Sequence, residues 1–67
     1  MDSVLQAIGQ ELRAERERNL ISLAELARTT RIPLRNLELL EEGRSEELPG
    51  PVFIKGFLRA YYKALGL

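Results

Sequence analysis

The fold of this chain is decided by residues 23–42, which read LAELARTTRIPLRNLELLEE. Apolar residues recur there at helical spacing in two short runs, one on each side of a TTRIP segment. Two short helices that cross steeply need a small residue where they approach, and Ala27 provides it. A shared apolar wedge comes from Leu26, Ile32, Leu37 and Leu40. This pattern predicts a helix-turn-helix rather than an ordinary helical hairpin, with a slightly altered turn because Arg31 stands where many such turns carry Gly.

Start and stop signals mark the ends of four predicted helices. Ser3 and Ser22 each begin a capping box, which opens the first and the second helix. Pro51 suits the first turn of the fourth helix, where its missing N–H costs nothing. Asn19 and Gly43 are predicted left-handed ends of the first and third helices. The helices are expected near residues 4–18, 23–30, 34–42 and 51–65.

These elements predict an all-α fold: one compact four-helix domain over residues 1–67, with a longer fourth helix packed on the helix-turn-helix. A chain of 67 residues has room for a single core. The residues expected in that core are Leu12, Leu26, Ala27, Ile32, Leu37, Leu40, Ile54, Leu58 and Tyr61. The pattern contains no alternating stretch that would suggest a strand.

The composition argues against catalysis, cofactors and metals. The sequence has no Cys and no His, which removes thiol nucleophiles, imidazole bases and zinc sites. Ser22 reads as a helix cap, and Glu41 and Glu42 point about 100° apart on a helix, so they are not a carboxylate pair. No signal peptide and no run of about 18 apolar residues is visible. We therefore expect a non-catalytic binding module.

A helix-turn-helix suggests DNA binding, so the third helix is the first candidate surface. The DNA-binding candidates are Arg28, Arg31, Leu34, Arg35 and Glu38. Residues 38–47 carry five Glu against Arg44 alone, and each Glu near a phosphate repels it. Formal net charge is zero, whereas phosphate-binding proteins usually carry a basic excess. Nucleic-acid binding is therefore expected to be weak.

The predicted fourth helix has a wider apolar arc than core packing requires. Its core stripe is made by Ile54, Leu58, Tyr61 and Leu65, and a second stripe by Phe53, Phe57, Ala60 and Ala64. Together they span roughly 160°, against the ~100° of an ordinary surface helix. Exposed aromatic residues beside basic ones are typical of a protein-binding hot spot. The alternative is that both Phe complete the core or meet a further helix. The partner-binding candidates are Phe53, Phe57, Lys55, Arg59 and Tyr61.

The sequence resembles the cytoplasmic helix-turn-helix domain of the RodZ family, bacterial cell-shape proteins. The likeness is carried by SLAELARTTRIPLRNLELLEEG and then by LPGPVFIKGFLRAYYKALGL, from about residue 8 to 67. It implies a cytoplasmic domain that precedes a membrane-spanning helix and binds the actin-like cytoskeletal protein MreB. In that family, aromatic residues one turn apart on the fourth helix make the contact, and Phe53 and Phe57 stand at those positions.

The resemblance also implies that this chain is an N-terminal fragment of a membrane-anchored protein, without the fifth helix that the family often has. Two functions thus remain open at the level of sequence. One is a protein-binding adaptor that docks on an MreB-like protein. The other is a DNA-binding transcriptional regulator of the phage-repressor-like class, for which the scaffold alone speaks.

Overall fold

The computed structural model describes residues 3–67. Its elements are α1 (Ser3–Arg18), α2 (Leu23–Thr30), α3 (Leu34–Glu42), a short 3₁₀ turn η1 (Ser45–Glu47) and α4 (Pro51–Ala64). The all-α prediction is confirmed, and no predicted helix end is more than one residue from the observed one. Ser3 is a helical residue rather than a cap. η1 lies between α3 and α4, outside the four helices that the sequence predicts.

Local signals start α2 and end α3 as the sequence predicts. The Ser22 hydroxyl caps α2 by accepting a hydrogen bond from the Glu25 N–H at 3.0 Å. Gly43 ends α3 in the left-handed region, with φ of 70°. The prediction for α1 was wrong: the left-handed residue is Leu20, with φ of 57°, and not Asn19. The side-chain amide of Asn19 instead donates to a carbonyl of the last turn of α1 at 2.7 Å, which satisfies that helix end.

The turn between α2 and α3 is built on Arg31. This residue adopts the left-handed conformation, with φ of 61° and ψ of 25°, that Gly usually supplies in such turns. Its N–H donates to the Ala27 carbonyl at 2.8 Å, which closes the end of α2. The turn is therefore not altered as the sequence suggested, because the Arg31 backbone takes the usual conformation.

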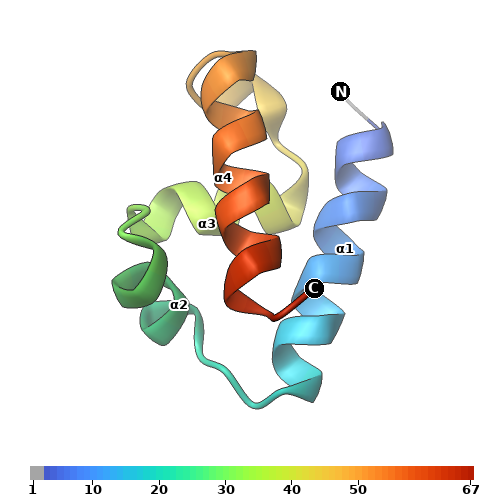
Figure 1. The fold of residues 1–67 in the computed structure, drawn as a ribbon. Helices are drawn as coiled ribbons and strands as arrows, with labels where there is room; N and C mark the ends of the chain where they lie inside the picture. The colour runs from blue at the N-terminus through green and yellow to red at the C-terminus, as the bar shows by residue number, and fades with distance from the viewer. Residues whose placement is uncertain (1–2) are drawn as a thin grey trace.

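α3 lies at the centre of the domain and contacts α1, α2 and α4. α4 crosses in front of α3 in Figure 1 and also contacts α2, while α1 stands at the side of the bundle. A helix with neighbours on three sides must bury most of its surface. This explains why α3 contributes four residues to the interior although it is only nine residues long.

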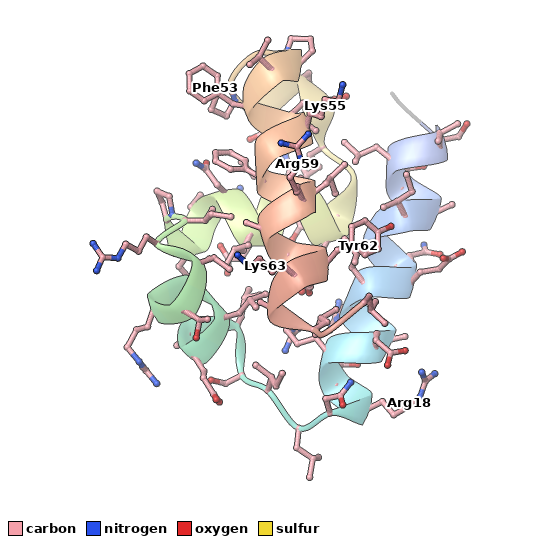
Figure 2. The ribbon with its side chains drawn as sticks, in the orientation of Figure 1. Arg18, Phe53, Lys55, Arg59, Tyr62 and Lys63 are labelled. Carbon is pink, nitrogen blue, oxygen red and sulfur yellow. The ribbon has the colours of Figure 1, made fainter. Side chains whose placement is uncertain are left out.

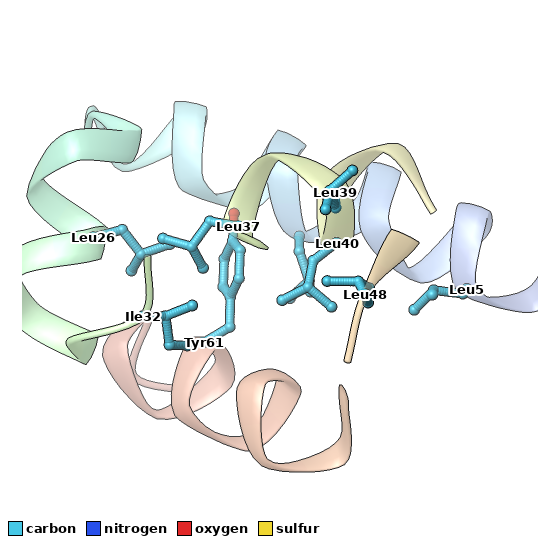
Figure 3. Close-up of a cluster of buried hydrophobic side chains, with 9 residues drawn as sticks. Leu5, Leu26, Ile32, Leu37, Leu39, Leu40, Leu48 and Tyr61 are labelled. Atoms are coloured by element: carbon cyan, nitrogen blue, oxygen red, sulfur yellow. The ribbon is translucent and has the colours of Figure 1, made fainter. Parts of the chain in front are cut away.

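The core is one cluster that runs through the whole domain (Figure 3). Its buried members are Leu5, Leu12, Leu26, Ile32, Leu37, Leu39, Leu40, Leu48 and Tyr61. Six of the nine predicted core residues are in this cluster, and Ala27, Ile54 and Leu58 are half-buried against it. The amphipathic pattern therefore identified the correct faces of α2, α3 and α4.

Leu39 is buried although it is not among the residues that the sequence predicts for the core. The side chain is only 3% exposed. Leu48, which follows η1, joins the same buried cluster, as does Leu5 from the first turns of α1. In Figure 3 Leu39, Leu48 and Leu5 lie toward one end of the cluster. The chain after α3 thus covers a side of that helix that would otherwise face water.

Candidate functional site

The outer face of α3 is where a DNA-reading helix-turn-helix places its base contacts. Arg35 forms ion pairs there with Glu38 at 3.3 Å and with Glu47 of η1 at 3.9 Å. Arg44, just after α3, pairs with Glu42 and Glu47. Both arginines already face carboxylates of the same domain, so this surface has little free positive charge for a phosphate.

The remaining DNA candidates lie at the end of α2 and the start of α3. Arg28 and Arg31 are exposed at the end of α2 and form no ion pair within residues 3–67. Leu34, at the start of α3, is partly exposed. The structure brings Arg35 and Glu38 together as an ion pair, whereas Arg28 and Arg31 lie at the end of α2.

α4 carries the exposed aromatic and basic residues that the sequence singled out (Figure 2). Phe53 is 59% exposed, near the start of the helix. Phe57, one turn later, is half-buried against the core cluster. Lys55 and Arg59 are exposed, and both lie on faces of α4 that point away from the bundle. These four residues form what we call the α4 surface.

Tyr61 does not belong to the α4 surface, although the sequence analysis included it among the partner-binding candidates. Its side chain has no exposed area. The ring points from α4 toward α3, inside the core cluster (Figure 3). The reason is its position on the core stripe of α4, which also contains Leu58 and Leu65.

The Tyr61 hydroxyl is part of a buried polar network with Arg16 of α1 and Glu41 of α3. Arg16 Nε and Nη2 donate to the two Glu41 carboxylate oxygens at 2.7 and 3.1 Å. Arg16 Nη1 also donates to the Ile21 carbonyl at 2.9 Å. Tyr61 Oη donates to Glu41 Oε2. One carboxylate therefore joins three helices, and no buried side-chain polar atom in the described chain lacks a partner.

Contacts within this network shift the pKa values of two of its members, Tyr61 and Arg16. Burial, followed by the hydrogen bond and the negative charge of Glu41, raises the pKa of the Tyr61 hydroxyl. The hydrogen bond to Glu41 raises the pKa of the Arg16 guanidinium. Tyr61 is thus kept neutral and Arg16 charged, so neither of these two side chains supplies a nucleophile or a general base. Its role is to hold α1, α3 and α4 together.

Sequence reasoning missed this network because it grouped Glu41 with the solvated acids near the end of α3. A usable signal was present. Glu41 follows Leu37 by four residues and Leu40 by one, which places it on the core side of the helix. A carboxylate there requires a cation or hydroxyl from another helix, and Tyr61 on a core stripe requires a partner for its hydroxyl.

Among residues 3–67, no group of three or more His, Cys, Asp or Glu side chains could hold a metal ion. No helix in residues 3–67 is both long and apolar enough to cross a bilayer. An open apolar groove lies between the first turns of α1 and the start of α4, lined by residues that include Val4, Ile8, Leu48, Pro51 and Ile54.

Two short helices joined by a left-handed turn, with a third and fourth helix closing the core, define a helix-turn-helix domain. The family model described as "Helix-turn-helix domain" matches residues 11–67, and the chain belongs to this family. The match covers α2, α3, α4 and the second half of α1.

One curated relative is similar over part of its length. It is the "Uncharacterized membrane protein YmfM" of Bacillus subtilis (strain 168), which is 38% identical over 47 residues. These residues are 70% of this chain and 16% of the relative, so the chain spans about a sixth of that protein. No solved structure gives a significant match.

Proposed function

We propose that this domain is a non-catalytic adaptor that docks through the α4 surface on an actin-like filament protein of the MreB type. The partner class comes from the resemblance to RodZ, which rests on the LPGPVFIKGFLRAYYKALGL block that forms α4 and its approach. The proposal further places the domain on the cytoplasmic side of a membrane-anchored protein. The Bacillus subtilis relative is named as a membrane protein, which supports the membrane anchor.

The observation that carries the proposal is the exposure of Phe53. More than half of its surface faces water, on an ordered helix of a domain that has little apolar area to spare. A rigid aromatic residue in this setting gives a partner a large contact area at a low entropy cost. Phe57 adds to the contact area offered by Phe53, because it contacts the core on one side and remains partly exposed on the other.

Replacing Phe53 with Ala is expected to leave folding nearly unchanged and to weaken partner binding about 30-fold, or ~2 kcal/mol. Titration of the filament protein followed by fluorescence anisotropy measures the binding, and thermal melting followed by circular dichroism measures the fold. Val52→Ala is the matched control: Val52 is 82% exposed, adjacent in sequence and on a different side of α4. That variant should bind like the parent chain.

Phe57→Ala is expected to weaken binding as well, but with a measurable loss of stability because Phe57 packs against the core. Comparison of the two variants therefore separates contact with the partner from support of the fold. Undiminished binding by Phe53→Ala would contradict the proposal. So would an equal loss on Val52→Ala, since the effect would then not be specific to the aromatic residue.

DNA binding is the second candidate function, and Arg28 and Arg31 favour it because they are exposed and free of ion pairs within the described domain. Against it, Arg35 on the outer face of α3 is paired with Glu38 and Glu47. We expect a dissociation constant no tighter than roughly 10⁻⁵ M on mixed-sequence duplex at physiological salt. An anisotropy titration measures it. Sub-micromolar binding that weakens on Arg35→Ala would make DNA the primary ligand.

A further inference from the structure

The charges of this domain are separated between its two sides, although the formal net charge is zero. α2 with its cap and α4 carry Arg28, Arg31, Lys55, Arg59 and Lys63 against a single acid, Glu25. α1, α3 and η1 with the adjoining Arg44 carry eight Glu against five Arg. α2 and α4, which contact each other, therefore carry a net charge of +4, and α1, α3, η1 and Arg44 carry a net charge of −3. We call these two groups of elements the basic side and the acidic side.

The ion pairs follow the same division. All five arginines of the acidic side lie within 4 Å of a carboxylate. None of the five cations of the basic side has such a partner in the part of the chain that the structure describes, and all five are exposed. Unpaired cations on two helices that contact each other raise the local positive potential. The basic side therefore has charge that no group of the domain neutralises.

A groove joins the two basic helices. It is lined by Thr29 and Thr30 at the end of α2 and by Ala60, Lys63 and Ala64 of α4. The two threonine hydroxyls donate to backbone carbonyls of their own helix, at 3.1 and 2.8 Å. Lys63 is thus the one charged residue of the groove, and small side chains line the α4 side. Figure 2 shows Lys63 on the face of α4 next to α2, with Arg59 one turn away.

We propose that the α4 surface, together with Lys63 one turn beyond Arg59, binds an acidic partner segment. Carboxylates of that segment contact Lys63 and Arg59 while Phe53 makes the apolar contact. This inference rests on the proposed docking function and adds the charge of the partner. The small Ala60 and Ala64 side chains leave room for a partner backbone, and the unpaired cations complement Asp and Glu. A carboxylate of the partner can form an ion pair with the ammonium group of Lys63, the charged residue of the groove. The basic side also steers an acidic partner toward α4 before contact.

The first test uses a poly-glutamate peptide on the ¹⁵N-labelled protein and follows amide shifts by NMR. We expect shifts at residues 29–31 and 59–64 and none on α1. Arg59→Glu with Lys63→Glu should abolish them. The matched control is Arg13→Glu with Arg18→Glu, which reverses two exposed cations of α1. Figure 2 shows Arg18 at the end of α1, pointing away from α4. Shifts that centre on α3, or that survive the α4 charge reversal, would overturn the inference.

The second test uses the bacterial actin at 50 mM and 500 mM salt. Arg59→Glu with Lys63→Glu should weaken binding about tenfold at low salt, the combined effect of two exposed charge contacts, and less than about twofold at high salt. Phe53→Ala should weaken it at both concentrations. If the parent does not bind the actin, the proposed function fails, and the peptide test still decides the charge of the partner.

The same NMR measurement distinguishes three other occupants of the basic side. Duplex DNA and phosphatidylserine vesicles are titrated in place of the peptide, and a second copy of the chain is tested by raising the protein concentration. Tighter binding of DNA or vesicles than of poly-glutamate would overturn the inference, because the surface would then prefer phosphate. Concentration-dependent shifts without any probe would assign the basic side to self-association with the acidic side of a neighbour, and would also overturn it.

Discussion

Glu41→Ala is expected to unfold the domain. The substitution leaves the Arg16 guanidinium buried without its counter-ion and removes the acceptor of the Tyr61 hydroxyl. Breaking one side of a buried ion pair typically costs about 3–5 kcal/mol. A domain of this length has about 3–10 kcal/mol of total stability. Loss of most of the helical circular-dichroism signal at 37 °C is the expected result, with urea titration to quantify any remaining fold.

Two further variants test the physical reason. Glu42→Ala changes the adjacent, exposed carboxylate and should alter stability by less than about 0.5 kcal/mol. The triple change Arg16→Met, Glu41→Leu and Tyr61→Phe removes every polar member and should recover much of the loss, since a buried polar network can be exchanged for apolar packing. A stable Glu41→Ala protein would show that solvent reaches the Arg16 site and that the network does not hold the helices together.

Gly9→Ala is expected to destabilise the domain by about 2 kcal/mol or more. A Cβ at Gly9 would overlap the Leu40 carbonyl oxygen and lie 2.6 Å from the Glu41 carbonyl oxygen. Both atoms are backbone atoms of α3, so α1 would have to move away from α3 as a unit. The shift would also strain the Arg16–Glu41 contact, which joins the same two helices. Thermal melting measures the effect.

Gly56→Ala is the matched control for Gly9→Ala, because the same exchange is made in the interior of α4 with open space around it. Ala is favoured over Gly in a helix by roughly 1 kcal/mol, so this variant should be more stable than the parent chain. The two substitutions are therefore expected to have opposite signs. Equal stabilisation by both would mean that α1 and α3 do not approach as closely at Gly9 as the structure shows.

The relation between scaffold and function depends on particular side chains rather than on the fold. The chain belongs to the helix-turn-helix family, and α3 corresponds in position to the helix with which DNA-binding helix-turn-helix proteins read bases. The charges of α3 and η1 oppose that use, because Arg35 and Arg44 are paired with Glu of the same domain. The unpaired cations and the exposed Phe53 lie instead on or next to α4. These side chains are the reason why we propose the fourth helix as the binding surface.

Local sequence determined where the helices begin and end. Ser22, Pro51 and Gly43 act within a few residues of their own position, through a cap hydrogen bond, a preset φ and a left-handed φ. The helical spacing of Leu37 and Leu40 likewise identified the buried side of α3. These features could be predicted because each depends on neighbours in the chain.

Tertiary structure alone decided which charges are buried and which are free. Glu41 faces the core because Arg16, 25 residues earlier, and Tyr61, 20 residues later, lie against it. Leu39 is buried because the chain after η1 returns across α3, and Phe57 is half-buried because α4 packs on the core. The separation of charge appears only when α2 meets α4 and α1 meets α3. Each of these depends on contacts between distant segments, whose burial and pairing energies local periodicity does not encode.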